Sequence, residues 1–448
     1  MNAEVAIIKT AAETALANVF NEARTRLPGG GAVAAQRASA FELFAKEGLP
    51  HRRIEDWKYT DLRALMREAK PLASPPDAAA KARAKRAGAL LGDVETRRLV
   101  FVDGAFVPDL SDLAGLEPGL SVGSLADALA SGDPVLADKL GKLAPASDMA
   151  VALNTALMGD GAVIRIGAGA TTERPLHLLF VASEKPAATF VHSLIVVAPG
   201  ARAMLIESHE GPAGSDYQVN DAVELFVGEG AHVDHVKIIG EGAQALHVST
   251  LAAAVGAKAR FNAFTFTMGG AVVRNQMFLN FDGEDTVAGI RGATLIKGRQ
   301  HADTTLVANH IARGCQSREV FKSVLDDEAH GVFQGRIVVK PGAQQTDAKM
   351  MTRALLLSDR AEADNKPELE IFADDVQCGH GATAGALDNE LKFYLMARGI
   401  PAAEAEALLI QAFLGEAVEG IEHAGLREAL MEEVAAWLKA RGRDGATA

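Results

Sequence analysis

The sequence has little cysteine and little aromatic character. Its two cysteines, Cys315 and Cys378, are too few for a disulfide framework or for a structural zinc site made of cysteine alone. Aromatic residues make up 5% of the chain, whereas glycine contributes 43 of its 448 residues. We therefore expect reduced thiols and a tightly turning backbone that is packed mainly with Val, Ile, Leu and Ala.

The chain also lacks a basic excess and long apolar runs. Its formal net charge is −13, which argues against nucleic acid as a partner because contact with phosphates needs a basic footprint. No run of 18 or more apolar residues is present, so we expect no membrane span. The first twenty residues carry Glu4, Lys9 and Glu13, a pattern unlike a signal peptide. We expect a cytoplasmic protein.

Several catalytic motifs are missing as well. The sequence contains no phosphate-binding P-loop, no dinucleotide-binding glycine pattern between a strand and a helix, no G-x-S-x-G nucleophile elbow and no H-E-x-x-H zinc helix. Nucleotide chemistry or hydrolysis by this chain alone is therefore poorly supported, and we expect a protein that is not itself an enzyme.

Sequence texture divides the chain into three parts. Residues 1–95 are rich in helical spacing, residues 96–385 are rich in short apolar runs and glycine, and residues 386–448 are helical again. At the start of the middle part, residues 99–107 read as a hairpin whose turn is Asp103-Gly104.

A weak internal repeat runs through the middle part. Gly-Ala opens a short alternating segment at Gly200, Gly230 and Gly256, and a looser copy begins at Gly292, so the spacings are 30, 26 and 36 residues. A recurrent turn-and-strand unit of this length favours a β-solenoid, in which each turn buries its face on its neighbours. An ordinary β-sandwich with Gly-Ala turns is the alternative.

The stretch 369–400 combines possible chemistry with a possible docking helix. If residues 376–380 are extended, the Cys378 and His380 side chains point to the same face. Thiolate and imidazole are suitable ligands for iron or iron–sulfur species, but two ligands do not complete a site. A buried structural cysteine beside a hydrogen-bonded histidine is the alternative. Cys315 lies beside Arg313 and Arg318, which would favour a thiolate, although a loop thiol without function explains it equally well.

The chain is then expected to pass through a glycine-rich turn into terminal helices. Asp388 is a plausible N-cap, and Gly399 a plausible end, of the first helix. Two apolar stripes follow, which are Ala405, Leu408, Leu409, Ala412 and Phe413, and then Leu426, Leu430, Val434, Trp437 and Leu438.

A series of motifs resembles the SufB/SufD family of iron–sulfur cluster assembly scaffolds. They are 317–322 (SREVFK), 332–335 (VFQG), 343–348 (AQQTDA), 355–358 (LLLS), 367–371 (PELEI), 378–383 (CGHGAT) and 393–400 (FYLMARGI). The segment 48–60 (GLPHRRIEDWKYT) resembles the SufD branch, and the shortage of cysteines argues for the same branch. Gly379 stands where the family typically has serine.

The resemblance implies a mainly β fold, a right-handed parallel β-helix between helical ends. It implies a non-catalytic scaffold subunit that pairs with a SufB-like subunit and binds a SufC-like ATPase. His380 and Cys378 would contribute to a transient iron–sulfur cluster shared with the SufB-like partner, with no cofactor bound permanently. The residues implied in ATPase docking are Asp388, Leu391, Phe393, Tyr394, Arg398, Leu409 and Phe413.

Three questions stay open at this point. The isolated chain could form a homodimer. A SufB-type subunit with a reduced cysteine set is an alternative within the family. A β-helix carbohydrate-active enzyme is an alternative from another class, although such enzymes usually need clustered carboxylates or calcium ligands and usually secretion.

Overall fold

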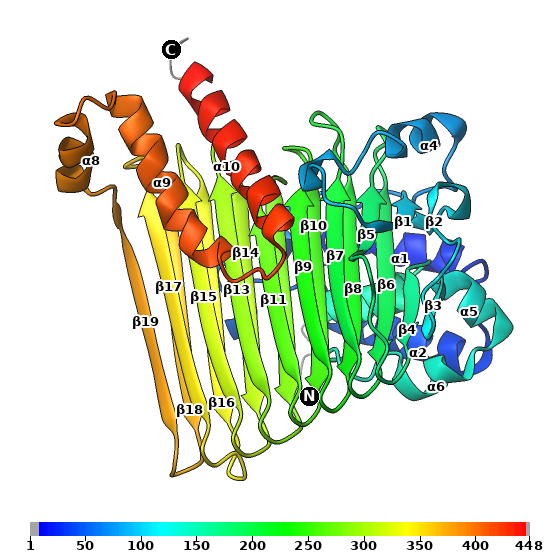
Figure 1. Ribbon diagram of the computed structural model, residues 1–448. Helices are drawn as coiled ribbons and strands as arrows, with labels where there is room; N and C mark the ends of the chain where they lie inside the picture. The colour runs from blue at the N-terminus through cyan, green and yellow to red at the C-terminus, as the bar shows by residue number, and fades with distance from the viewer. Residues whose placement is uncertain (1–8, 445–448) are drawn as a thin grey trace, which may run out of the picture.

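The chain winds into a parallel β-solenoid with helices at both ends (Figure 1). The computed structural model describes residues 9–444, so residues 1–8 and 445–448, the ends of the predicted helical parts, lie outside it. From residue 162 onward, successive strands alternate between a ten-stranded and a nine-stranded sheet, which form two opposite walls of the solenoid. The predicted solenoid is confirmed, and the β-sandwich interpretation is wrong.

The ten-stranded sheet contains β1 (Arg97–Val102), β2 (Ala105–Phe106), β5 (Leu176–Val181), β7 (Arg202–Glu210), β9 (His232–Gly240), β11 (Arg260–Thr267), β13 (Val287–Ile296), β15 (Gln316–Leu325), β17 (Asp347–Leu356) and β19 (Gln377–Ala386). The nine-stranded sheet contains β3 (Leu120–Ser124), β4 (Ala162–Ile166), β6 (Ala188–Val197), β8 (Gln218–Val227), β10 (Leu246–Val255), β12 (Val272–Phe281), β14 (His301–His310), β16 (His330–Val339) and β18 (Glu362–Ile371).

The number of residues per solenoid turn varies less than the spacing of the sequence repeat indicated. Paired positions 202, 232, 260, 287, 316, 347 and 377 lie 27 to 31 residues apart. Gly200 and Gly230 occupy equivalent corners with φ of 68° and 64°, where glycine avoids the strain of a side chain. Gly256 corresponds instead to Gly228, since both amides donate to the last strand residue of the preceding turn. Gly292 lies inside β13, so the expected fourth corner is wrong.

The first turn is closed by short local elements. The predicted hairpin is confirmed, because β1 and β2 pair antiparallel with Val102 opposite Ala105. Phe106, Leu116 and Val122 pack against the interior core of the solenoid. That core consists of the inward side chains of both sheets, which alternate with outward ones along each strand. The solenoid therefore does not expose its interior at this end.

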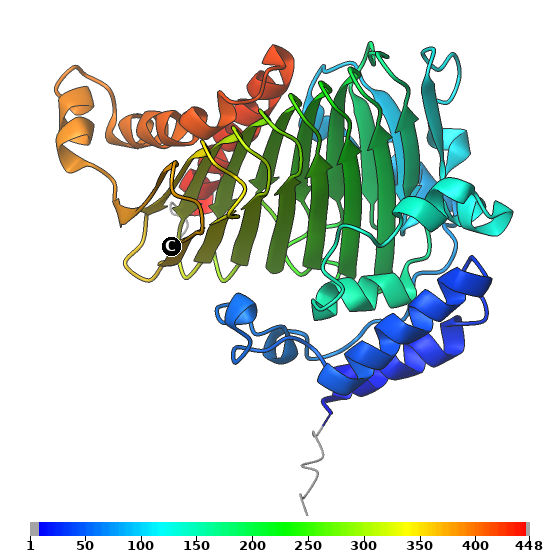
Figure 2. The ribbon, with the colours of Figure 1, turned by 90° about the horizontal axis from the view of Figure 1, so that it is seen from below.

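N-terminal helices cover the outer face of the nine-stranded sheet (Figure 2). Three helices share one apolar cluster with Phe190 and Val248 of that sheet. They are α1 (Ala11–Ala23), α2 (Gly31–Glu47) and α7 (Met149–Leu157). The shorter elements are η1 (Glu55–Trp57), α3 (Leu62–Leu65), α4 (Ala78–Ala84), η2 (Ala89–Leu91), η3 (Pro108–Leu110), α5 (Leu125–Ser131) and α6 (Pro134–Lys139). Helices α5 to α7 fall inside the middle part of the chain, residues 96–385.

Three helices follow the solenoid, and the last two of them cover the outer face of the ten-stranded sheet. They are α8 (Asn389–Met396), α9 (Ala402–Val418) and α10 (Ala424–Asp444). The stripe predicted from Leu426 to Leu438 packs on this face. On α9 the buried residues are Ala405, Ile410, Leu414, Ala417 and Val418. Of the predicted stripe, Ala405 is therefore buried, Leu409 and Phe413 are half-buried, and Leu408 and Ala412 are exposed. None of the helices within residues 9–444 has the length and apolar character needed to cross a membrane.

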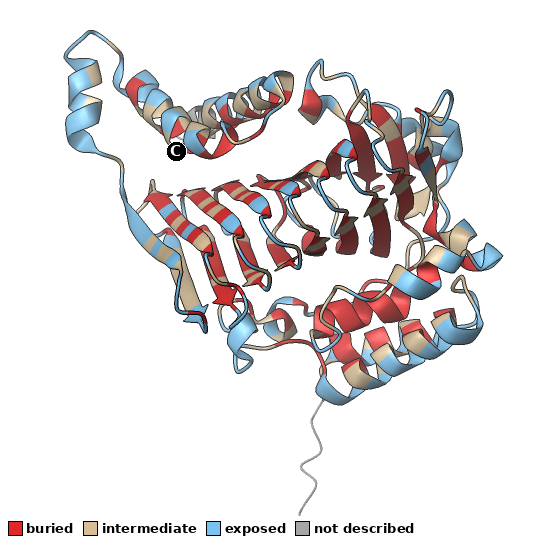
Figure 3. Cartoon of the chain, turned by 60° about the horizontal axis from the view of Figure 1, so that its bottom comes forward, coloured by how far each residue is buried: buried red, intermediate tan, exposed pale blue. Residues whose placement is uncertain are grey.

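The last turn of the solenoid is open (Figure 3). Strands β18 and β19 are the terminal strands of the two sheets, and no residue of either strand is buried. Ile371 and the adjacent Phe372 are 41% and 59% exposed. Each terminal strand presents backbone groups that have no neighbouring strand, which makes this end of the molecule a template for pairing.

Candidate functional site

Cys378 and His380 lie on β19, at the open end of the solenoid. The expected extended conformation is confirmed, and β19 pairs in parallel with β17. Cys378 lies opposite Ala348, and His380 lies opposite Met350, both of which face the interior core. The thiol and the imidazole therefore share the inward face of the last strand. Cys378 is half-buried against the core, whereas His380 is exposed.

The surroundings keep the Cys378 thiol protonated. Burial, with further contributions from Asp347 and Glu319, raises its pKa above the ordinary value, although a hydrogen bond from the Ala348 backbone acts in the opposite direction. A thiol of this kind is a poor nucleophile by itself and becomes a good ligand when a metal ion displaces its proton.

A buried carboxyl group stands behind the pair. Glu319 on β15 lies opposite Met350, which in turn lies opposite His380, so the three residues form one inward row. Burial raises the pKa of Glu319 to about 7, and neither carboxyl oxygen has a hydrogen-bond partner among the described residues. Sequence reasoning missed Glu319, because its inward orientation follows only from the register.

Cys315 has a different environment from the one expected. It is fully buried in the interior core, and burial raises its pKa. The two neighbouring arginines turn away from it, since Arg313 donates to Gln345 and Arg318 to Asp347. The expectation that arginine favours a thiolate here is therefore wrong.

The residues expected to dock an ATPase form two groups. Asp388 caps α8 by accepting from the amides of Glu390 and Leu391 at 2.8 and 3.1 Å, as predicted. Leu391, Leu409 and Phe413 line one groove of about 620 Å³ between α8, α9 and the ends of β17 and β19.

The second group is outside this groove. Phe393 and Tyr394 are 71% and 54% exposed, and the Arg398 guanidinium lies 3.4 Å from the centre of the Tyr394 ring. Helix α8 buries none of its residues. An exposed aromatic surface on a helix that makes so little contact with the rest of the chain is typical of a protein interface.

The two candidate regions are not adjacent. The expected glycine-rich turn is wrong, because Gly379, Gly381 and Gly385 all lie within β19. Six residues separate His380 from the end of the strand, which corresponds to about 20 Å. The Cys378–His380 pair and α8 therefore stand at opposite ends of β19.

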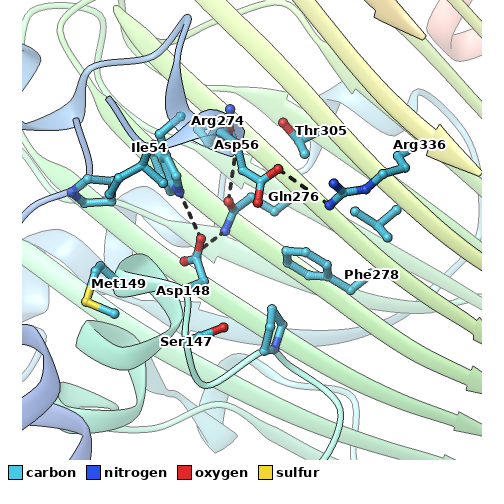
Figure 4. Close-up of a pocket in the computed structure, with 14 residues that line it drawn as sticks. Ile54, Asp56, Ser147, Asp148, Met149, Arg274, Gln276, Phe278, Thr305 and Arg336 are labelled. Carbon is cyan, nitrogen blue, oxygen red and sulfur yellow. Dashed lines mark hydrogen bonds and ion pairs between the residues drawn. The ribbon is translucent and has the colours of Figure 1, made fainter. Parts of the chain in front are cut away.

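The segment 48–60, singled out in the sequence, joins the N-terminal region to the solenoid. Trp57 is buried, donates from Nε1 to Asp148 at 3.0 Å and lies 4.3 Å from the Arg274 guanidinium. A cavity of about 300 Å³ opens beside it, and Asp56 faces Arg336 across this cavity at 3.5 Å (Figure 4). Because Asp56 and Arg336 pair with each other, we interpret the cavity as part of the structural contact between the N-terminal region and the solenoid, and not as a ligand site.

A second buried polar group lies inside the solenoid and was also missed. Glu207, His209, His235 and Lys237 all point inward from β7 and β9, and Glu207 lies opposite Lys237. The pattern of charged residues two apart, recurring one solenoid turn later, is the signal that could have revealed them.

Comparison with known proteins agrees with this architecture. Residues 180–413 match the family described as "SUF system FeS cluster assembly, SufBD core domain", and residues 10–178 match the SufBD protein N-terminal region. An iron–sulfur cluster assembly SufBD family protein of Synechocystis is 33% identical over 412 residues, covering 89% of each chain.

Two proteins named SufD are also similar. The iron–sulfur cluster assembly protein SufD of Escherichia coli is 30% identical over 403 residues, covering 89% of this chain and 92% of its own. The Bacillus subtilis SufD is 27% identical over 286 residues, covering 63% and 65%. The carbohydrate-active enzyme alternative finds no support in these matches. The chain belongs to the SufBD family of the SUF system for iron–sulfur cluster assembly, and it is SufD-like.

Proposed function

We propose that this chain is the SufD-like scaffold subunit of a Suf assembly complex. In this proposal it has no catalytic activity of its own, pairs with a SufB-like subunit through the open end of the solenoid, and binds a SufC-like ATPase through α8 and α9. The family match carries the proposal, and the unpaired strands β18 and β19 supply a surface for the pairing. The SufB-type alternative is weakened by the similarity to proteins named SufD.

His380 and Cys378 are proposed as ligands for a transient iron–sulfur cluster at the subunit boundary. Both face inward on the terminal strand, where a partner strand would complete the ligand set. The cluster is cargo in this proposal, and no cofactor is bound permanently. A half-buried thiol and an exposed imidazole leave room for ligands from a second chain.

Anaerobic co-expression with SufB-like and SufC-like partners tests the cluster site. We expect His380→Ala to lower the iron and sulfide bound by the purified complex, while complex formation is retained. The control is His51→Ala, because His51 is a partly exposed histidine of the N-terminal region, outside the strands of the solenoid. Unchanged iron and sulfide in the His380 variant would overturn its role as a ligand.

Substitutions of two exposed phenylalanines should distinguish the two proposed interfaces. Phe393→Asp should abolish capture of the ATPase and spare the SufB-like partner, whereas Phe372→Asp should do the reverse. Burial of a phenylalanine contributes about 1.5–3 kcal/mol, so each loss of affinity should be roughly 10- to 100-fold. If either variant weakens both interactions equally, the separation of the two surfaces is wrong.

Without a partner, the open end is proposed to pair with a second copy of the chain. Terminal strands that lack neighbours favour edge-to-edge association. Light scattering on the isolated protein should give a dimer, and Phe372→Asp should shift it toward monomer. A dimer that is unaffected by Phe372→Asp would place the contact elsewhere.

A further inference from the structure

Three potential metal ligands meet inside the solenoid, well away from β19. His209 lies near the end of β7, Glu241 follows β9, and His247 lies near the start of β10. One ligand atom from each residue lies within 4.8 Å of the other two. All three side chains are buried, with His247 completely inaccessible and His209 only 2% exposed.

The imidazole rings are held in place but are incompletely satisfied. The His209 ring stacks on Phe180 with 4.7 Å between ring centres and meets the His247 ring edge-on at the same distance. Nδ1 of His247 lies 3.0 Å from Oε2 of Glu241. The Nε2 atom of His247 has no hydrogen-bond partner within residues 9–444, and Nε2 of His209 lies 3.8 and 3.7 Å from carboxylate oxygens of Glu207 and Asp221, beyond hydrogen-bond distance. Buried polar atoms without partners are costly, and they point to an unseen ligand.

A small cavity reaches two of the three residues, His209 and Glu241. It has a volume of about 20 Å³, and its lining includes His209, Glu241, Phe180 and the hairpin turn Asp103-Gly104. A space of this size holds one water molecule or one ion. The hairpin turn that closes the first solenoid turn thus lines the same small cavity as His209 and Glu241.

The charges of the interior cluster are unbalanced. Glu207, Asp221 and Glu241 carry three formal negative charges, and Lys237 is the one permanently cationic group among them. Lys237 binds Glu207 at 3.0 Å and also bonds Asp221, so it already occupies the cation position between those two carboxylates. Glu241 is left with the neighbouring imidazole of His247. Buried charges of this kind require a counter-ion.

We propose that His209, Glu241 and His247 form a buried binding site for one divalent first-row transition-metal ion. Two imidazole nitrogens and one carboxylate oxygen are a donor set suited to zinc, cobalt or ferrous iron. A water molecule in the small cavity would supply a further ligand. A dication would balance the buried Glu241 carboxylate and give the unpartnered imidazole nitrogen of His247 a role. The site is independent of the proposed cluster ligands on β19.

Cobalt provides a direct spectroscopic test on the full-length protein. The protein is stripped with a chelator, dialysed and titrated anaerobically with Co²⁺. We expect one equivalent to bind with visible d–d bands and without a thiolate charge-transfer band. Binding should persist in His380→Ala and Cys378→Ser. A thiolate band, or loss of binding in those two variants, would assign the metal to β19 and overturn the proposal.

Substitution of the ligands provides the second test. Glu241→Gln and His247→Gln should each lower the affinity for Zn²⁺ at least about 100-fold, since even outer-shell changes cost 10- to 100-fold. The matched control is His310→Gln, because His310 is an equally buried histidine that bonds Ser317 at 3.0 Å. Folded ligand variants that bind Zn²⁺ with native affinity would overturn the site.

Anomalous diffraction from zinc-soaked crystals of the native protein covers the case in which the variants do not fold. A peak between His209, Glu241 and His247 would support the site. The absence of a peak there, with or without peaks elsewhere, would overturn it.

Discussion

Replacement of Glu319 by glutamine should change how the stability of the protein depends on pH. Glu319 is fully buried two strands behind His380, and burial raises its pKa from 4.5 to about 7. In the unfolded chain the same carboxyl returns to its ordinary value. The native protein therefore holds a proton on this group at pH values where the unfolded chain has released it.

The sign and size of the effect follow from this difference. Below pH 4.5 both states are protonated, and the stabilisation that the protonated group provides is fully present. Between pH 4.5 and 7 the unfolded chain alone is ionised, so the free energy of unfolding falls as pH rises. The total loss is about 3 kcal/mol, because each pH unit corresponds to about 1.4 kcal/mol. Above pH 7 both states are ionised and the loss stays constant.

Glutamine keeps the shape of the side chain and does not titrate. We expect the stability of Glu319→Gln relative to the native protein to rise by about 3 kcal/mol between pH 4.5 and pH 8, whatever fixed cost the buried amide adds. Urea unfolding followed by circular dichroism across this range measures the difference. Glu42→Gln, on the exposed side of α2, is the control and should give a flat difference. A flat profile for Glu319→Gln would refute the buried titration.

Three further predictions follow from other buried groups. Trp57→Ala should lower the free energy of unfolding by about 3–5 kcal/mol, since it removes the ring against Arg274 and a hydrogen bond, and thermal unfolding measures this. Leu414→Ala, at a fully buried position of α9, should cost about 2–5 kcal/mol in the same assay. Iodoacetamide should modify Cys378 slowly near pH 8 and faster at higher pH, because its pKa is raised. Cys315 should stay unmodified until the protein unfolds, because it is buried. Mass spectrometry of the labelled peptides distinguishes the two cysteines.

Structural features that depend on residues adjacent in the sequence could be predicted from the sequence alone. Asp103-Gly104 closes the first hairpin, with φ of 48° and 78° at its two residues, and such turns favour short residues that tolerate positive φ. Asp388 caps α8 because its carboxylate can reach the first amides of the helix. The recurrent Gly-Ala corners were enough to indicate a solenoid, although they mixed two corner positions.

Features that depend on the pairing of distant strands could not be predicted. Whether Glu319 or Lys237 faces the interior depends on the register of its strand, and a shift of one residue reverses the face. The side of α9 that is buried could not be predicted for a related reason. Apolar residues at 405, 408–410, 412–414 and 417–418 cover most of its circumference, so spacing alone does not select the side that meets the ten-stranded sheet.

The two ends of the solenoid differ in a way that favours the proposed pairing with a second chain. At the first turn, the β1–β2 hairpin and residues such as Leu116 cover the interior core. At the last turn, β18 and β19 end the sheets with no buried residue, and Cys378 packs only partly against the core. Repeat proteins need polar caps to stay soluble as monomers, and this end has exposed Ile371 and Phe372 instead. The same strand carries the thiol and the imidazole, so a partner that covers the open end would also bury them and add its own ligands.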